Sequence, residues 1–180
     1  MTRRIAIPIP MAMAVAVAAC IGAAFTAPAA AQTKSGERAE PVAVPIDRLR
    51  DGDHAYTTYS GIADSTSVVV RDSAAWRQLW TELTRPFVPP PPLPPIDFAR
   101  EMVVVAALGA RPTAGYDIVI EGAARDSAGL EVAVRRTSPG AGCPVLAVVT
   151  QPVDLARVPT LAVETRFRER TVVTPCAGAP

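Results

Sequence analysis

The chain contains 180 residues, of which 49% are hydrophobic and 19% are charged, and its formal net charge at pH 7 is +1. A chain of this length can bury one hydrophobic core and is too short for two ordinary domains. The charge balance argues against nucleic-acid binding, because displacing counterions from a duplex requires a clustered basic surface. We therefore expect a single domain whose partners are not nucleic acids.

The first 31 residues have the pattern of a secretory signal peptide. Arg3 and Arg4 precede an uncharged apolar run over residues 5–25, and three alanines at 29–31 supply a small-residue cleavage site. We expect cleavage there and a mature protein in the periplasm, on the cell surface or secreted. An alternative stays open, because Cys20 ends a Val-Ala-Ala-Cys box typical of lipoproteins. Only lipidation of Cys20 would attach the protein to a membrane.

Cleavage after residue 31 leaves 16 basic and 17 acidic residues, a net charge of about −1. Residues 32–54 mix Pro, Arg, Glu and Asp without periodicity, which predicts a flexible leader. We expect order to begin near Tyr56, with a single domain over residues 55–174 and a tail over residues 175–180.

The domain is predicted to begin with two strands and a helix. Residues 56–62 are aromatic and β-branched and residues 66–71 contain three valines, so both favour strands. A helix follows, with Asp72 or Ser73 as its N-cap. Trp76, Leu79, Trp80 and Leu83 share one face of it. This stripe indicates core packing, and a partner-docking surface is the alternative.

Proline dominates the next segment. Pro86 is predicted to end the helix, and residues 89–95, Pro-Pro-Pro-Pro-Leu-Pro-Pro, are expected to run in an extended polyproline II conformation as an exposed spacer. The alternative function for such a tract is that of a ligand for an aromatic groove.

The second half of the chain is predicted to consist mainly of β-strands. Residues 102–109 form a continuous apolar run typical of a central strand covered on both faces. Residues 116–121 and 130–135 alternate and predict an antiparallel hairpin, and residues 145–150 and 160–167 predict further strands. The sequence thus predicts a mainly β (α+β) fold, an antiparallel β-sandwich or open barrel of about eight strands with one packed helix.

No catalytic apparatus is apparent in the sequence. His54 is the single histidine, no Gly-x-Ser-x-Gly elbow or phosphate loop occurs, and residues 51–54 lack the spacing of a metal loop. We expect no enzyme activity, no cofactor and no metal. Cys143 and Cys176 are an even pair in an oxidising compartment and predict a disulfide. A reactive Cys143 thiol in a hydrolase is the alternative.

Two loops are the candidate partner-binding residues, because recognition concentrates on loops carried by a rigid sheet. The first loop offers an arginine, a conformationally fixed proline, a glycine able to take positive φ, and an aromatic ring. An ordinary turn whose tyrosine packs inward is the alternative. The predicted binding residues are Arg111, Pro112, Thr113, Gly115 and Tyr116 in the first loop and Gly140 and Gly142 in the second.

The order of these features resembles the C-terminal domain of PrcB-like proteins. The matching features are Arg71-Asp72 before the helix with Trp76 and Trp80, then Ile96-Asp97-Phe98, Met102, Leu108-Gly109, Arg111 to Tyr116, Gly140-Ala141-Gly142-Cys143, Thr150 and Pro152. The resemblance covers about residues 56–167. It implies an accessory subunit that stabilises a surface or secreted protease.

The first loop is also similar to the Asn-Pro-Thr-Thr-Gly-Tyr loop of chagasin-like cysteine-protease inhibitors, which are β-sandwiches. Arg111 stands in place of the asparagine and Ala114 in place of the second threonine, while residues 140–142 match a second, Gly-rich loop. The third inhibitor motif, Arg-Pro-aromatic, occurs only at residues 85–87, ahead of the first loop.

The sequence therefore predicts an exported, non-catalytic accessory or binding module whose partner is a protein, with a protease as the candidate. The alternative is an envelope structural protein, or a lipoprotein anchored through Cys20, with no protease partner.

Overall fold

The computed structural model describes residues 40–49 and 54–176. The predicted signal peptide with Cys20, most of the predicted leader, the acidic residues beside His54 and the last four residues lie outside this range. The described elements are β1 (Val42–Val44), β2 (Asp47–Arg48), the 3-10 helix η1 (His54–Thr57), β3 (Thr66–Val70), α1 (Ser73–Thr84), β4 (Glu101–Ala107), β5 (Asp117–Asp126), β6 (Gly129–Pro139), β7 (Val153–Pro159) and β8 (Thr165–Thr174).

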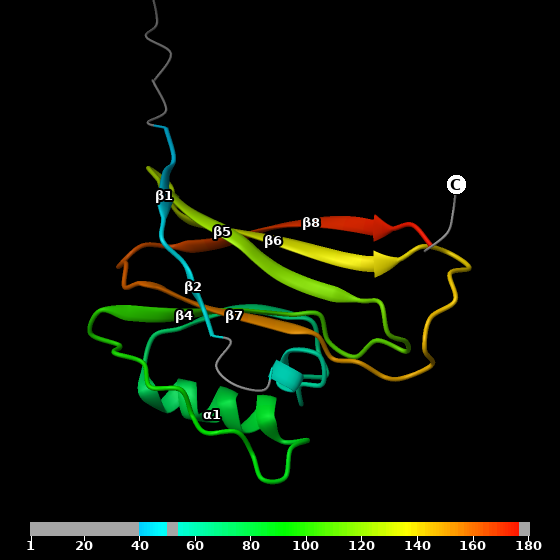
Figure 1. Ribbon diagram of the computed structural model, residues 1–180. Helices are drawn as coiled ribbons and strands as arrows, with labels where there is room; N and C mark the ends of the chain where they lie inside the picture. The colour runs from blue at the N-terminus through cyan, green and yellow to red at the C-terminus, as the bar shows by residue number, and fades with distance from the viewer. Residues whose placement is uncertain (1–39, 50–53, 177–180) are drawn as a thin grey trace, which may run out of the picture. The chain divides into compact units, whose positions relative to one another are not determined.

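The strands form two four-stranded sheets that stack as a sandwich (Figure 1). One sheet has the order β1-β5-β6-β8 and the other β2-β7-β4-β3, and the sheets do not close into a barrel. The predicted mainly β sandwich with one helix is therefore confirmed. One pairing departs from the antiparallel prediction: β6 and β8 run parallel, because β7 lies between them in the chain but belongs to the other sheet.

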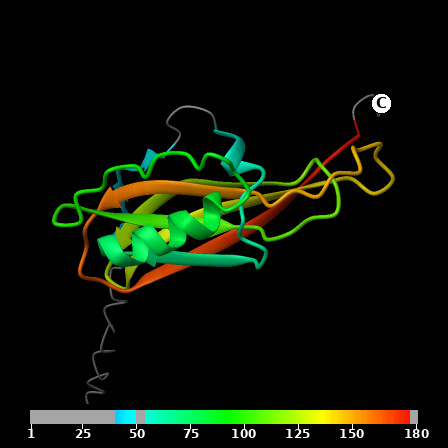
Figure 2. The same ribbon diagram turned by 90° about the horizontal axis from the view of Figure 1, so that it is seen from below.

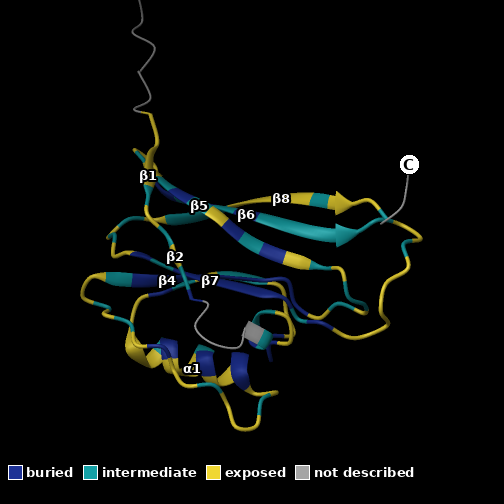
Figure 3. Cartoon of the chain, in the orientation of Figure 1, coloured by how far each residue is buried: buried dark blue, intermediate teal, exposed yellow. Residues whose placement is uncertain are grey.

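Strand β4 is buried on both faces, as its continuous apolar run predicts. Val103, Val105 and Ala107 pack in the cluster that contains the helix tryptophans. The alternate residues Met102, Val104 and Ala106 pack between the two sheets. Because side chains alternate across a strand, one apolar run contributes to both layers of the core. Figure 3 shows this strand and β7 as the most deeply buried part of the sandwich.

Helix α1 lies over the outer face of the second sheet (Figure 2). Asp72 is its N-cap, and the carboxylate accepts hydrogen bonds from Ala74 N at 2.9 Å and Ala75 N at 2.8 Å. Trp76 and Trp80 are 2% and 5% exposed. The prediction that the apolar stripe packs into the core is thus confirmed.

The proline tract does not act as a free spacer. The indole N–H of Trp76 donates to Pro94 O and that of Trp80 to Pro91 O, both at 3.0 Å. Pro94 is buried while Pro92 stays exposed. A buried indole needs an acceptor for its N–H, and a proline carbonyl is available because proline lacks only the backbone donor. The tract therefore covers the helix, which corrects the spacer prediction.

Three other boundaries differ from prediction. Residues 42–48, placed in the flexible leader, form β1 and β2, which pair with β5 and β7. Residues 56–62 form the end of η1 and an isolated bridge at Tyr59 rather than a strand. Residues 145–149 form a loop. Strands β1 and β2 are only three and two residues long, too short for an alternating pattern to be visible in the sequence.

The predicted last strand over residues 160–167 also shifts. Strand β8 begins at Thr165 and continues to Thr174, beyond the apolar residues on which the prediction rested. Its outer positions carry charged side chains, which is typical of a sheet edge protected from further pairing.

A buried carboxylate joins the two sheets. Asp154 on β7 is 1% exposed, and its Oδ2 accepts from Ile120 N on β5 at 2.8 Å. Arg48 on β2 approaches the same oxygen at 3.4 Å and donates to Ile120 O. These groups satisfy each other where β5 has a register shift between Ile120 and Gly122. A buried charge is tolerated when it is paired and hydrogen-bonded in this way.

Replacing Trp76 by Phe should lower the free energy of unfolding by about 2 kcal/mol, because the change removes buried volume and leaves Pro94 O without its donor. Chemical denaturation measures this loss. Pro92→Ala is the control and should change stability by less than about 1 kcal/mol. Equal stability of Trp76→Phe and the parent would restore the spacer interpretation.

Replacing Asp154 by Ala should lower the free energy of unfolding by about 3 kcal/mol, since it leaves the buried Ile120 N without its acceptor and removes the carboxylate paired with Arg48. Asp47→Ala on the neighbouring strand removes a surface pair with Arg157 and should cost less than about 1 kcal/mol. Similar losses for the two variants would contradict the role assigned to Asp154.

Candidate functional site

Two crossover loops lie side by side at one end of the sandwich (Figure 1). Residues 108–116 connect β4 to β5, and residues 140–152 connect β6 to β7. Arg111 N donates to Thr150 O at 2.8 Å and Thr150 N to Arg111 O at 3.0 Å. Ala114 N donates to Leu146 O at 3.0 Å. The structure therefore brings together the two loops that the sequence singles out separately.

Gly115 permits the close approach of these loops. Its φ is +91°, a conformation that residues with a side chain rarely adopt. A Cβ at this position would lie 3.3 Å from Pro139 and 3.4 Å from Val145. In the second loop Gly142 has a φ of +76°. Both glycines are exposed, so the backbone at the loop surface is open to a partner.

Most of the other predicted binding residues are partly buried or engaged in contacts within the protein. Thr113 is partly buried and its carbonyl accepts from Thr150 Oγ1 at 3.1 Å. Tyr116 is partly buried against the core between the sheets, as the inward-packing alternative proposed. Its ring also lies under Arg111, whose Cζ is 5.8 Å from the ring centroid. Pro112 is exposed and Gly140 partly buried.

Arg111 has no carboxylate partner within 4 Å among residues 40–49 and 54–176. Its Nη2 donates to Leu108 O at 2.6 Å, and its guanidinium lies over the Tyr116 ring. A cation held in place without a counter-charge is suited to bind an acidic group of a partner.

The outer face of the first sheet is different, because its charges are paired. Arg170 and Arg135 hold the pKa of Glu121 below its usual value, with the Arg170 hydrogen bond as the largest cause. A hydrogen bond from Arg166 lowers the pKa of Asp126 in the same way. These pairs form within the sheet surface and leave their charges little free to bind a partner.

Sequence reasoning missed the most exposed apolar segment. A strand was predicted over residues 145–150, yet residues 144–149, Pro-Val-Leu-Ala-Val-Val, run over the surface in the second loop (Figure 3). The exposed fractions are 38% for Val145, 76% for Leu146, 36% for Val148 and 61% for Val149. Such a grouping of exposed apolar side chains is a candidate interaction surface. The signal in the sequence was an apolar run inside a segment bounded by Gly and Pro.

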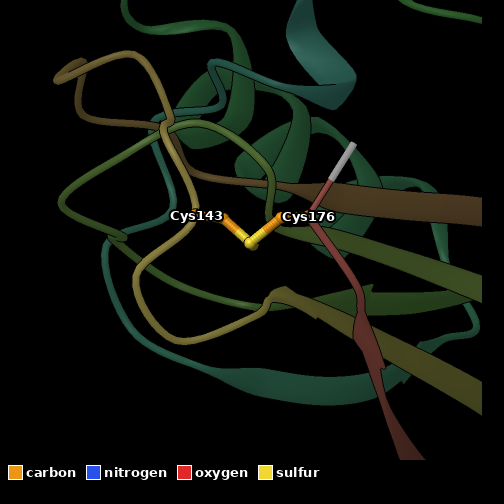
Figure 4. Close-up of a disulfide and its surroundings, with 2 residues drawn as sticks. All are labelled: Cys143 and Cys176. Atoms are coloured by element: carbon orange, nitrogen blue, oxygen red, sulfur yellow. A yellow bond between two sulfur atoms is a disulfide. The ribbon is translucent and has the colours of Figure 1, made fainter. Parts of the chain in front are cut away.

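The predicted disulfide between Cys143 and Cys176 is present (Figure 4). It links residues 33 apart in the sequence and ties the second loop to the end of β8. Gly140 N donates to Thr174 O at 2.8 Å beside it. With its sulfur in the disulfide, Cys143 presents no free thiol for nucleophilic chemistry.

A pocket of about 160 Å³ opens beside the loops. Its lining includes Leu108, Arg111, Tyr116, Arg136, Ser138 and Thr171. The residues that β6 and β8 contribute, which also include Thr137, were not identified from the sequence, since an arginine and three hydroxyl residues on strands carry no motif.

Within residues 40–49 and 54–176 there is no group of three or more potential metal ligands. In the same range no helix is long and apolar enough to cross a membrane. The possible cation site beside His54 involves residues outside the described part of the chain.

Residues 102–159 match the family model described as PrcB C-terminal. The match spans β4 to β7 and includes both crossover loops, so the chain is PrcB-like over the segment that carries the candidate site. The family resemblance drawn from the residues is confirmed. No curated protein and no solved structure matches the chain.

Removing the disulfide with Cys143→Ser and Cys176→Ser should lower the free energy of unfolding by about 3–4 kcal/mol, as expected for a closed loop of 33 residues. Amide exchange at Gly140 and Cys143 should quicken most, because the second loop loses its tie to β8. Amides of β4 serve as the internal control. Unchanged exchange at Gly140 would show that hydrogen bonds alone hold this loop.

Proposed function

We propose that this PrcB-like chain is an exported, non-catalytic accessory module that binds a protease of the cell envelope and stabilises it. The binding surface consists of residues 111–116 of the first loop and residues 140–149 of the second loop. The observation that carries the proposal is the group of exposed apolar side chains at residues 144–149, held beside Arg111 on a rigid scaffold.

The apolar side chains supply the driving force for association. Leu146 and Val149 are the most exposed of the group, and covering such side chains contributes about 25 cal/mol per Å² of apolar surface. A central apolar patch with a polar rim is the usual arrangement of a protein interface. Arg111 and the loop backbone provide that rim.

The loops are already ordered before binding. Backbone hydrogen bonds join Arg111 to Thr150 and Ala114 to Leu146, and the disulfide fixes Cys143. Association therefore requires little further loss of loop entropy, which favours affinity. The family resemblance supports a protease as the partner, since PrcB-like proteins are associated with surface or secreted protease complexes.

Stabilisation is favoured over insertion into a protease cleft. The Arg85-Pro86-Phe87 segment, the third inhibitor-like motif, follows α1, and Phe87 packs against the helix-side core. Arg85 donates to Gly61 O at 3.0 Å. In the first loop Thr113 and Ala114 are hydrogen-bonded to the second loop.

The test is quantitative capture of proteases from envelope and culture-fluid extracts on the purified protein. The double variant Leu146→Asp/Val149→Asp should retain at least about tenfold less protease than the parent, because it places charges in the apolar centre of the interface. Val88→Asp is the matched control, since Val88 is 96% exposed at the other side of α1. It should bind as the parent does.

A retained protease should also lose activity more slowly at elevated temperature when the parent protein is added. Faster loss of activity, or direct inhibition, would favour the inhibitor-like function. Capture of no protease, or equal capture by all three proteins, would favour the alternative of an envelope structural protein or a lipoprotein anchored through Cys20.

A further inference from the structure

The pocket lies between the first loop and the C-terminal parts of β6 and β8. Arg136 and Ser138 follow Val134 on the side of β6 that faces the core, and Thr171 pairs with Arg136 on β8. Leu108 and Arg111 approach from the first loop. The pocket thus joins the end of the core to the binding surface.

Two guanidinium groups on its wall have unused donors. Arg111 Nε and Arg136 Nε are buried and have no hydrogen-bond partner among the described residues. Buried donors in proteins are almost always paired, and leaving one unpaired costs free energy. Both arginines already use other nitrogens. Arg111 Nη2 donates to Leu108 O. Arg136 Nη1 lies 2.8 Å from Glu169 Oε2, and Arg136 Nη2 donates to Ser65 Oγ.

The net charge of Arg111, Arg136 and Glu169 suits a ligand with a single negative charge. Arg111 and Arg136 contribute two positive charges, and Glu169 cancels one of them. A single carboxylate would neutralise the remainder, whereas a phosphate dianion would leave excess negative charge at the end of the core. The volume of about 160 Å³ accommodates a carboxylate and a short aliphatic stem.

We propose that this pocket binds the side-chain carboxylate of an Asp or Glu residue on the partner protein. Planar guanidinium groups match carboxylate oxygens in a two-donor geometry, and the hydroxyls of Ser138 and Thr171 are available as further donors. Chain-terminal carboxylates are usually captured by successive backbone N–H groups. The charged lining of this pocket consists instead of side chains, which favours a side-chain carboxylate.

The neighbouring apolar loop makes the site specific for a protein. Tyr116 lines the pocket, and the adjacent Gly115 lies against Val145 of the exposed apolar segment. An acidic side chain entering the pocket would therefore place its own chain against this segment. The inference deepens the proposed function and relies on it only for the identity of the partner.

The direct test follows the Nε–Hε signals of the arginines by ¹⁵N NMR in the protein purified after export. The probe is N-acetyl-glutamate α-amide, which carries only a side-chain carboxylate. The signals of Arg111 and Arg136 should shift in a saturable manner. N-acetyl-glutamine amide and NaCl of equal ionic strength should produce no saturable shift. Absence of a saturable shift with the glutamate probe would overturn the proposal.

Two further probes identify the source of the anion. N-acetyl-alanine offers only a main-chain carboxylate, and inorganic phosphate offers a second oxyanion. Tighter binding of either than of the glutamate probe would overturn the assignment to an acidic side chain.

The matched variants are Arg111→Gln and Arg77→Gln. Arg111→Gln should weaken probe binding about tenfold, since a hydrogen bond to a charged group is lost. Arg77 lies exposed on α1, so its replacement should have no effect. Equal affinity of the Arg111→Gln variant and the parent would contradict the site. Thr171→Val provides a second variant, with a smaller expected loss, in case Arg111→Gln disturbs the loop.

These experiments separate the two proposals. Probe binding without capture of any protease would sustain the carboxylate pocket and refute the proposed function. Capture of a protease that Leu146→Asp/Val149→Asp abolishes, without probe binding, would sustain the function and refute the pocket.

Discussion

The fold depends on the burial of β4 on both faces. Six of its seven residues, 102–107, contribute alternately to the helix-side core and to the core between the sheets. A strand of this kind is stable only if each face is covered, so the sandwich needs α1 on one side and the first sheet on the other. The helix in turn needs acceptors for its two tryptophan N–H groups, and the proline tract supplies them. One apolar run thus explains the position of most other elements.

The same constraint produces the candidate site. Because β4 and β5 belong to different sheets, as do β6 and β7, the chain must cross between layers twice at the same end of the sandwich. Crossing segments cannot use ladder hydrogen bonds of either sheet, so they satisfy one another, as Arg111 and Thr150 do. Gly115 makes the approach possible and the disulfide secures the outer end. Two ordered loops therefore present apolar side chains that the core cannot accommodate.

The sequence predicted those features whose signal is local and strong. The apolar run of β4, the helix with its tryptophan stripe and its N-cap at Asp72 or Ser73, the hairpin of β5 and β6, and the disulfide pair could all be identified from the sequence. Sequence-based prediction failed for segments whose structure depends on pairing with residues far away in the chain. Strands β1 and β2 exist only because β5 and β7 offer free edges. Residues 145–149 have strand-like composition but no strand to pair with, and the pocket unites residues from two strands and a loop, a proximity that no spacing encodes.

The distribution of charge separates surfaces that are complete from one that is not. On the outer face of the first sheet, arginines of β6 and β8 are paired with Glu121, Glu131 and Asp126, so that face has no need of a partner. Between the sheets, Asp154 is matched by Arg48 and Ile120 N. At the loop end Arg111 and Arg136 have one carboxylate between them, and the Nε donors of both are unpaired within the described part of the chain. Arg157 on β7 also has an unpaired Nε there, but its charge is matched by Asp47. Charge and apolar exposure are both uncompensated at the loop end of the sandwich, which is why we propose the binding surface there.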